Sequence, residues 1–137
     1  MIAERVGEAW VHYLAAEAAS VPEARRIAGE IAAAFMESDQ FMAFELAVSE
    51  VVSNAVRHGG PRDDEIRFAV TPKDGYMCVQ VTDRGPGFVP RPGAMGTEDD
   101  DGGFGLFIVE QVTRRWGVTR EERCTRVWFE IDFAAAS

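Results

Sequence analysis

Glu50 and Asn54 are the residues whose types and spacing point most directly to chemistry. They stand four apart in a segment with helical apolar spacing, so their side chains should lie one turn apart on one helix face. The amide oxygen of Asn54 is a hard ligand suited to Mg²⁺, which binds few protein groups together with phosphate oxygens and water. The carboxylate of Glu50 could orient or deprotonate an attacking hydroxyl. Taken alone, such a pair is more often two solvated helix residues.

A second group of residues, Asp83, Gly85 and Gly87, follows a predicted strand. The Asp83 carboxylate could accept a hydrogen bond from an exocyclic amine such as that of adenine, and the glycines would let a flat ring approach the backbone. Asp before Gly also bonds its own backbone in ordinary turns. This motif alone therefore leaves both interpretations open.

A third group lies at the start of a predicted helix and comprises Gly103, Phe104, Gly105 and Leu106. Main-chain amides at a helix N-terminus can hold phosphate oxygens, although a flexible entry to the helix gives the same pattern. Because the three groups occur together and in this order, we interpret them as a pocket for Mg-ATP.

Two basic residues, Arg57 and His58, follow Asn54 at the end of its helix. Cations are favourable there because they offset the negative end of the helix dipole. For His58 this capping role is our default interpretation, and a phosphate contact is the alternative.

The elements that must position these residues are three helices and five strands. Ser20 to Glu23 form a capping box that predicts a helix running to Phe35 or Met36. A second helix is predicted from the Ser38 N-cap to Gly59, and a third over residues 104–116. The predicted strands span residues 8–15, 65–71, 76–82, 118–123 and 126–133.

The order of these elements predicts an α+β fold. Residues 72–75 favour a hairpin turn between the second and third strands, which should pair antiparallel, and the first strand could lie at a sheet edge. Residues 88–102 have no apolar periodicity and are predicted to form a long mobile loop. The sequence therefore predicts a two-layer α/β sandwich, with a mostly antiparallel sheet and helices on one face, formed as a single domain by residues 1–137.

Composition narrows the classes of function. The chain has 137 residues, 47% of them hydrophobic, which is enough for an apolar core without crosslinks. Its net charge of −9 argues against nucleic acid as a partner, because phosphate binding needs a basic surface. The sequence has no leader pattern and no apolar run of membrane-spanning length, so we expect a soluble cytoplasmic protein. The two cysteines lack metal-ligand spacing and suit a reducing compartment.

Three longer stretches carry a family resemblance: SVPEAR from Ser20, ELAVSEVVSNAVRH from Glu45, and TRVWFE from Thr125. With them the chain resembles the anti-sigma factor serine kinases of bacteria, which are stand-alone forms of the Bergerat ATP-binding fold. The resemblance implies a protein that binds ATP with Mg²⁺, sequesters a sigma factor and phosphorylates a serine of an anti-anti-sigma protein. It also implies a homodimer.

The resemblance assigns roles to individual residues. Glu50 matches the general base, Asn54 the Mg²⁺ ligand, and Asp83 and Thr125 the adenine contacts. The loop residues match as follows: Gly85 and Gly87 the adenine-side loop, Gly103 to Leu106 the phosphate loop, and Arg57 and His58 neighbours of the phosphates.

Two departures from the family pattern bear on these roles. Glu98 to Asp101 are four consecutive acidic residues that would repel a triphosphate unless they point outward or meet Mg²⁺. Cys124 stands where the family has glycine before Thr125. A nucleotide-modulated binding module without kinase activity therefore remains an alternative, as does a detached histidine-kinase catalytic domain. Against the latter, His12 is predicted in a strand and His58 at a helix end, and neither suits a phosphoacceptor helix.

Overall fold

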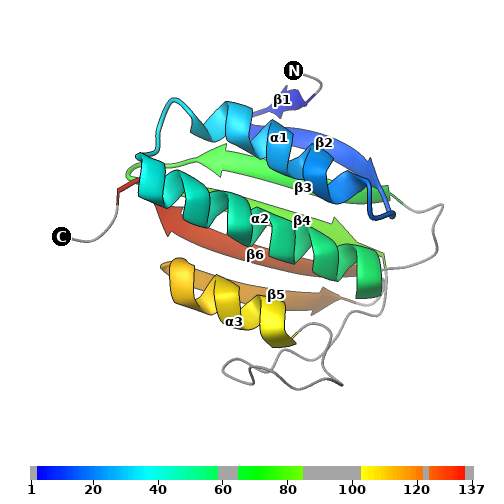
Figure 1. The fold of residues 1–137 in the computed structure, drawn as a ribbon. Coiled ribbons are helices and arrows are strands. Elements are labelled where there is room, and N and C mark those ends of the chain that lie inside the picture. Colours follow the sequence, from blue (N-terminus) through cyan, green and yellow to red (C-terminus); the bar gives the residue numbers. More distant parts are fainter. Residues whose placement is uncertain (1–2, 59–64, 85–102, 122–123, 135–137) are drawn as a thin grey trace.

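A six-stranded antiparallel sheet covered on one face by helices forms the described part of the molecule (Figure 1). This computed structural model describes residues 3–58, 65–84, 103–121 and 124–134. The strands are β1 (Glu4–Val6), β2 (Ala9–Ala15), β3 (Glu65–Pro72), β4 (Tyr76–Asp83), β5 (Arg115–Glu121) and β6 (Cys124–Asp132). The helices are α1 (Ser20–Ala32), α2 (Ser38–His58) and α3 (Gly103–Val112). The predicted fold class is confirmed.

The sheet has the order β1-β2-β3-β4-β6-β5, so β6 is inserted between β4 and β5. The predicted hairpin between β3 and β4 is present, with Lys73 N–H donating to the Tyr76 carbonyl at 2.8 Å and Gly75 at φ +90°. That φ lies in the left-handed region that glycine adopts without steric cost. The strand β2 does not lie at the edge of the sheet. It lies between β3 and β1, a strand that the sequence did not predict.

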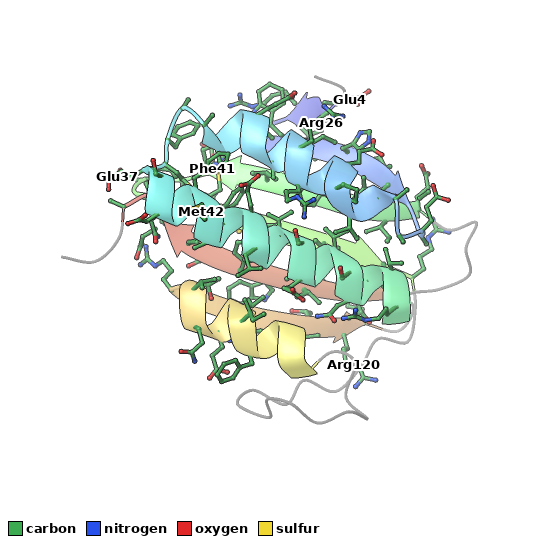
Figure 2. The ribbon with its side chains drawn as sticks, viewed as in Figure 1. Glu4, Arg26, Glu37, Phe41, Met42 and Arg120 are labelled. Atoms are coloured by element: carbon green, nitrogen blue, oxygen red, sulfur yellow. The ribbon has the colours of Figure 1, made fainter. Side chains whose placement is uncertain are left out.

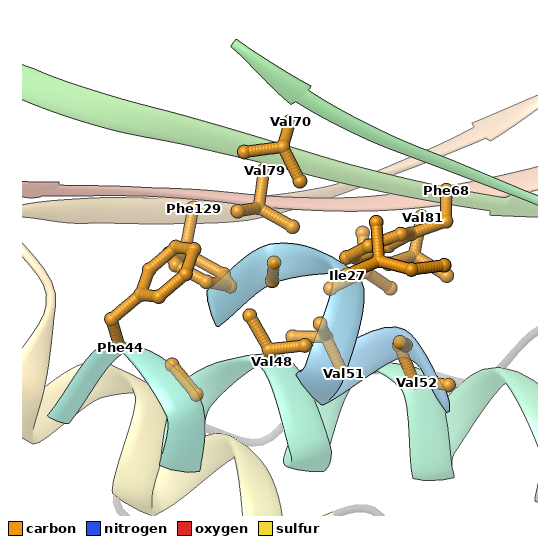
Figure 3. Close-up of a cluster of buried hydrophobic side chains, with 14 of the residues drawn as sticks. Ile27, Phe44, Val48, Val51, Val52, Phe68, Val70, Val79, Val81 and Phe129 are labelled. Carbon is orange, nitrogen blue, oxygen red and sulfur yellow. The ribbon is translucent and has the colours of Figure 1, made fainter. Parts of the chain in front are cut away.

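The core lies between the sheet and the helices α1 and α2, where the apolar side chains of both layers meet (Figure 3). Alternate residues of β4 and β6 point toward the helices and are fully buried, among them Val79 and Phe129. From α2, Phe44 meets Phe129 edge-on with ring centroids 6.2 Å apart. Burying a side chain of this size stabilises the fold by about 1.5–3 kcal/mol. The core therefore fixes α2 against the middle of the sheet.

The predicted capping box at the start of α1 is wrong. The N-cap position belongs to Ala19, which makes no side-chain cap bond, and the Ser20 hydroxyl donates instead to the Ala15 carbonyl at 2.6 Å. Glu23 does not reach back to the cap, because its carboxylate lies 3.1 Å from His12 Nε2 on β2. Contacts between α1 and β2 have replaced the local cap. The helix also ends at Ala32, earlier than predicted.

The predicted third helix is too long, because Trp116 belongs to β5. The chain leaves α3 after Val112, and Arg114 N–H donates to the Glu130 carbonyl at 2.8 Å as strand pairing begins. Trp116 follows Val112 at helical spacing but also precedes Val118 at strand spacing. Both Trp116 and Val118 pack against the core from β5, so tertiary contacts decided between the two periods.

No helix in the described ranges is both long and apolar enough to cross a membrane.

Gly117 on β5 is required by its neighbour in the sheet. A Cβ atom placed there would lie 2.8 Å from the ring of Trp128 on β6, which faces it across the strands. We predict that Gly117→Ala lowers the free energy of unfolding by about 1–3 kcal/mol, because the ring must shift. Urea denaturation would measure the change. In a Trp128→Leu background the same substitution should cost far less, and an equal cost in both backgrounds would assign the effect to the backbone instead.

Candidate functional site

Four elements meet at one end of the sheet, where the predicted functional residues gather. In Figure 1 this end is on the right: α2 and β4 end there, and β6 and α3 begin there. Asp83 closes β4 and pairs in register with Thr125 near the start of β6. Asn54 lies in the last turns of α2, the helix that packs over β4 and β6.

The side chains at this end of the sheet are polar but buried. Asn54 is 0% exposed, Thr125 1% and Asp83 5%. Asp83 continues the inward-facing series of Val79 and Val81 on β4, so it occupies a position that elsewhere in the strand is apolar. Neither Asp83 nor Thr125 is without an interaction partner. Polar groups are expensive to bury, and their concentration at one end marks that end as a candidate site.

Asn54 has one partnered and one unpartnered polar atom. Its Oδ1 accepts a hydrogen bond from Arg57 Nη2 at 3.1 Å, one turn further along α2. Its Nδ2 is buried and has no hydrogen-bond partner among the described residues. An unsatisfied buried donor costs about 1–3 kcal/mol. The full burial of Asn54 also excludes, for this residue, the interpretation as a solvated helix side chain.

Glu50 lies one turn before Asn54 but nearer the surface of the molecule. Its side chain is half-buried and lines an open hollow of about 400 Å³ together with Leu46 and Ser49 of the same helix. A carboxylate in this position is accessible to a hydroxyl group from outside the protein. The pair therefore presents one buried amide and one accessible carboxylate on successive turns.

The third group of predicted residues opens α3. Gly103, Phe104, Gly105 and Leu106 form the first turn of this helix, and that turn contains no acidic residue. The first main-chain N–H groups of a helix have no intrahelical acceptor and can hold an anion. His58 is the last residue of α2. The predicted positions of Gly85, Gly87 and the loop over residues 88–102, including Glu98 to Asp101, lie outside the described residues.

These groups fit a magnesium nucleotide in their chemistry. The Oδ1 atom of Asn54 is of the ligand type suited to Mg²⁺ beside phosphate oxygens, and it would exchange its hydrogen bond from Arg57 for the ion. Asp83 supplies an acceptor and Thr125 a hydroxyl for the edge of a base. The unpartnered Nδ2 of Asn54 is a hydrogen-bond donor, so the ligand it favours at this place is an acceptor such as a phosphate oxygen.

Thr125 could not be found from spacing alone, and only the family resemblance pointed to it. The signal that was present is its position in β6, where it replaces an apolar residue in a strict alternation that continues through Val127 and Phe129. Sequence analysis also missed the exposed apolar residues Met42 and Leu46, which line the same hollow as Glu50.

Cys78 is a poor candidate for chemistry. Burial raises the pKa of its thiol, the Glu130 carboxylate raises it further, and Lys73 lowers it. A raised pKa keeps the thiol protonated, and the protonated form is a weak nucleophile.

We predict that Asn54→Leu leaves the free energy of unfolding unchanged or raises it by up to about 1–3 kcal/mol. The substitution removes an unsatisfied buried donor, and the exposed Arg57 can turn to water. Urea denaturation would measure the change. Thr125→Val is the matched comparison, because it removes a buried hydroxyl from a partnered residue and should lower stability. A large loss of stability in Asn54→Leu would mean that Nδ2 has a structural partner.

Comparison with known proteins yields one family match and several structural ones. The model of the histidine kinase-like ATPase domain matches residues 14–131. No curated protein sequence matches the chain. A crystal structure of the RsbU and RsbW domains of Rv1364c from Mycobacterium tuberculosis superimposes with a TM-score of 0.66 at 20% identity, over 89% of this chain and 32% of that one.

Two histidine kinases are also similar in structure. The histidine kinase domain of the blue-light activated kinase EL346 from Erythrobacter litoralis has a TM-score of 0.57 at 18% identity, covering 88% of this chain and 62% of that one. Acinetobacter baumannii AdeS has a TM-score of 0.51 at 16% identity, covering 89% and 68%. At these identities the likeness shows the fold. The chain spans about a third of the length of the Rv1364c structure.

Proposed function

The chain belongs to the histidine kinase-like ATPase domain family, and from this premise we propose that it is an ATP-binding anti-sigma factor with serine kinase activity. In this proposal it binds Mg-ATP, sequesters a sigma factor and transfers the γ-phosphoryl group to a serine of an anti-anti-sigma protein. Residues 1–137 act as a single domain, and the protein is a cytoplasmic homodimer.

The observation that carries the proposal is the buried polar end of the sheet. Asn54, Asp83 and Thr125 are buried on α2, β4 and β6 at this end, and the Asn54 Nδ2 is a donor without a hydrogen-bond partner among the described residues, which suits a phosphate oxygen. In the proposal, Asp83 and Thr125 contact the adenine, and Asn54 binds Mg²⁺. When bound, Mg²⁺ would neutralise charge on the phosphate groups.

The remaining contacts surround the phosphates and the ring. The first turn of α3, from Gly103 to Leu106, donates main-chain N–H groups to phosphate oxygens. Arg57, whose guanidinium already lies 3.1 Å from Asn54, and His58 at the end of α2 stand beside the phosphates. Gly85 and Gly87, which lie outside the described residues, would line the adenine side, as the family resemblance implies.

Glu50 is the general base of the proposed reaction. The serine hydroxyl oxygen forms a bond to the γ-phosphorus, the bond from that phosphorus to the bridging oxygen breaks, and ADP leaves with that oxygen. The serine proton passes to the Glu50 carboxylate. The half-buried, accessible position of Glu50 supports this role, because the acceptor comes from outside the protein.

The choice of a serine kinase over a detached histidine-kinase domain rests on three points. The sequence motifs resemble the anti-sigma factor kinases, and one structural neighbour contains an RsbW domain. His12, in turn, lies in β2 with its Nε2 held 3.1 Å from Glu23, which is a poor position for a phosphoacceptor.

A second candidate is a binding module in which nucleotide shapes a protein-binding surface without phosphoryl transfer. The observation that favours it is the run of four acidic residues, Glu98 to Asp101, just before the phosphate-binding segment. Like charges there weaken the binding of a triphosphate.

We predict that the chain binds ATP in a magnesium-dependent way and labels a serine of its anti-anti-sigma protein. Isothermal titration calorimetry with and without Mg²⁺ measures binding, and transfer from γ-labelled ATP measures activity. Asn54→Leu should lose the magnesium-dependent part of binding while remaining folded. Glu50→Gln should bind ATP normally but transfer phosphate about 10²- to 10⁴-fold more slowly.

Glu30→Gln is the matched control for charge, because Glu30 is an exposed carboxylate on α1 paired with Arg26. It should leave both binding and transfer unchanged. ATP binding without transfer to any anti-anti-sigma protein would favour the binding module, and the absence of ATP binding would contradict both candidates.

A further inference from the structure

Two large apolar side chains are exposed on the outer surface of α2. Met42 is 69% exposed and Leu46 43%, and they stand one turn apart. Figure 2 shows Met42 on the part of α2 that is turned away from the sheet. The core of the molecule is built from the opposite side of this helix, so neither side chain is needed to complete it.

These side chains form a row with the proposed general base. Met42, Leu46 and Glu50 are spaced at four-residue intervals along α2, so they lie on neighbouring turns of one surface. All three line the same open hollow of about 400 Å³. An apolar anchor point and the carboxylate that would accept the serine proton therefore belong to one surface depression.

A hydrogen bond crosses from α1 to α2 beside the hollow. Arg25 of α1 donates from Nη1 to the Ser49 hydroxyl at 3.1 Å, and that hydroxyl donates to the Glu45 carbonyl at 2.9 Å. The chain of hydrogen bonds ties α1 to α2 beside the hollow. The residues of the hollow therefore stand on two helices that pack against each other, which limits the entropy cost of binding.

The charge of the hollow limits what it can bind. Glu45 and Glu50 contribute two carboxylates against the single guanidinium of Arg25, which is already engaged by Ser49. The whole chain also carries a net charge of −9. Electrostatic complementarity therefore favours a neutral or basic segment that carries an apolar side chain.

We propose that the hollow formed by Arg25, Met42, Glu45, Leu46, Ser49 and Glu50 is the docking surface for the protein that carries the acceptor serine. The proposal rests on the proposed kinase function and names how the partner is held. A neutral or basic segment of that protein places an apolar side chain on Met42 and Leu46 and its serine at Glu50.

The helix geometry also sets the spacing within the partner. With a rise of 1.5 Å per residue, Leu46 and Met42 lie about 6 and 12 Å along α2 from Glu50. An extended segment advances about 3.3 Å per residue. The anchoring apolar side chain of the partner should therefore lie about two to four residues from the acceptor serine.

The test uses the full chain and a purified anti-anti-sigma protein from the same genome, with ADP and Mg²⁺ for binding and ATP and Mg²⁺ for transfer. The double variant Met42→Ser/Leu46→Ser should weaken binding of the anti-anti-sigma protein at least tenfold. It should raise the KM for that protein by a similar factor, with kcat and the Kd for ATP unchanged. Thermal denaturation checks that the variant is folded.

The matched control is Val6→Ser/Tyr13→Ser, which removes two apolar side chains that are each 54% exposed on β1 and β2. It should leave binding and KM unchanged. If the protein binds its partner but transfers no phosphate, and the Met42→Ser/Leu46→Ser variant loses that binding, the docking surface stands and the kinase function fails.

Three results would overturn the docking surface. The first is a Met42→Ser/Leu46→Ser variant whose partner binding and KM equal those of the unmodified chain. The second is an unmodified chain that binds no anti-anti-sigma protein. The third is a change in self-association of that variant, measured by sedimentation, with partner binding intact, because it would assign the surface to a second copy of the chain.

Discussion

The packing of α2 on the middle of the sheet is the interaction on which the rest of the molecule depends. Phe44, Val48, Val51 and Val52 are fully buried against strands that are themselves distant in sequence. This contact sets the height and rotation of the helix, and with them the directions of every other residue on it. Residues on one side of α2 face the sheet, and those on the opposite side face solvent. The packing of the helix alone sets both directions.

The same contact explains how a polar site can exist next to an apolar core. The alternation of β4 and β6 continues without interruption from apolar residues into Asp83 and Thr125, so the pleat of the sheet aims these two side chains inward as firmly as it aims Val81. Asn54 is contributed by α2, which packs on the same face of the sheet. The rigid core therefore preorganises the polar groups, and the energy of burying them is offset by the apolar contacts beside them.

Sequence reasoning succeeded where the period of apolar residues and the chemistry of turns agree. The hairpin at Gly75, the long helix α2 and the place of Asp83 at a strand end all follow from local pattern.

Sequence reasoning failed where distant partners compete with local ones. The local pattern has the Ser20 hydroxyl accept a hydrogen bond from an N–H of its own helix. In the structure the hydroxyl donates instead to the Ala15 carbonyl of β2. Trp116 satisfies both helical and strand spacing, so only its contact with the core decides between them. Burial of Asn54 and exposure of Met42 depend on how α2 is rotated, which the sequence of the helix alone does not reveal.

The insertion of β6 between β4 and β5 has a consequence for how the protein folds. Pairing of Asp83 with Thr125 joins residues far apart in the chain, and closing a loop of that length costs entropy before any contact rewards it. Because β6 lies between β4 and β5, each of these two strands lacks a neighbour until β6 is present. During synthesis, β1 to β4 can pair as they emerge, but β4 keeps an open edge until the ribosome has released β6. Thr125 thus joins Asp83 only when β6 pairs with β4, so a nascent chain that stops before β6 lacks the complete polar site.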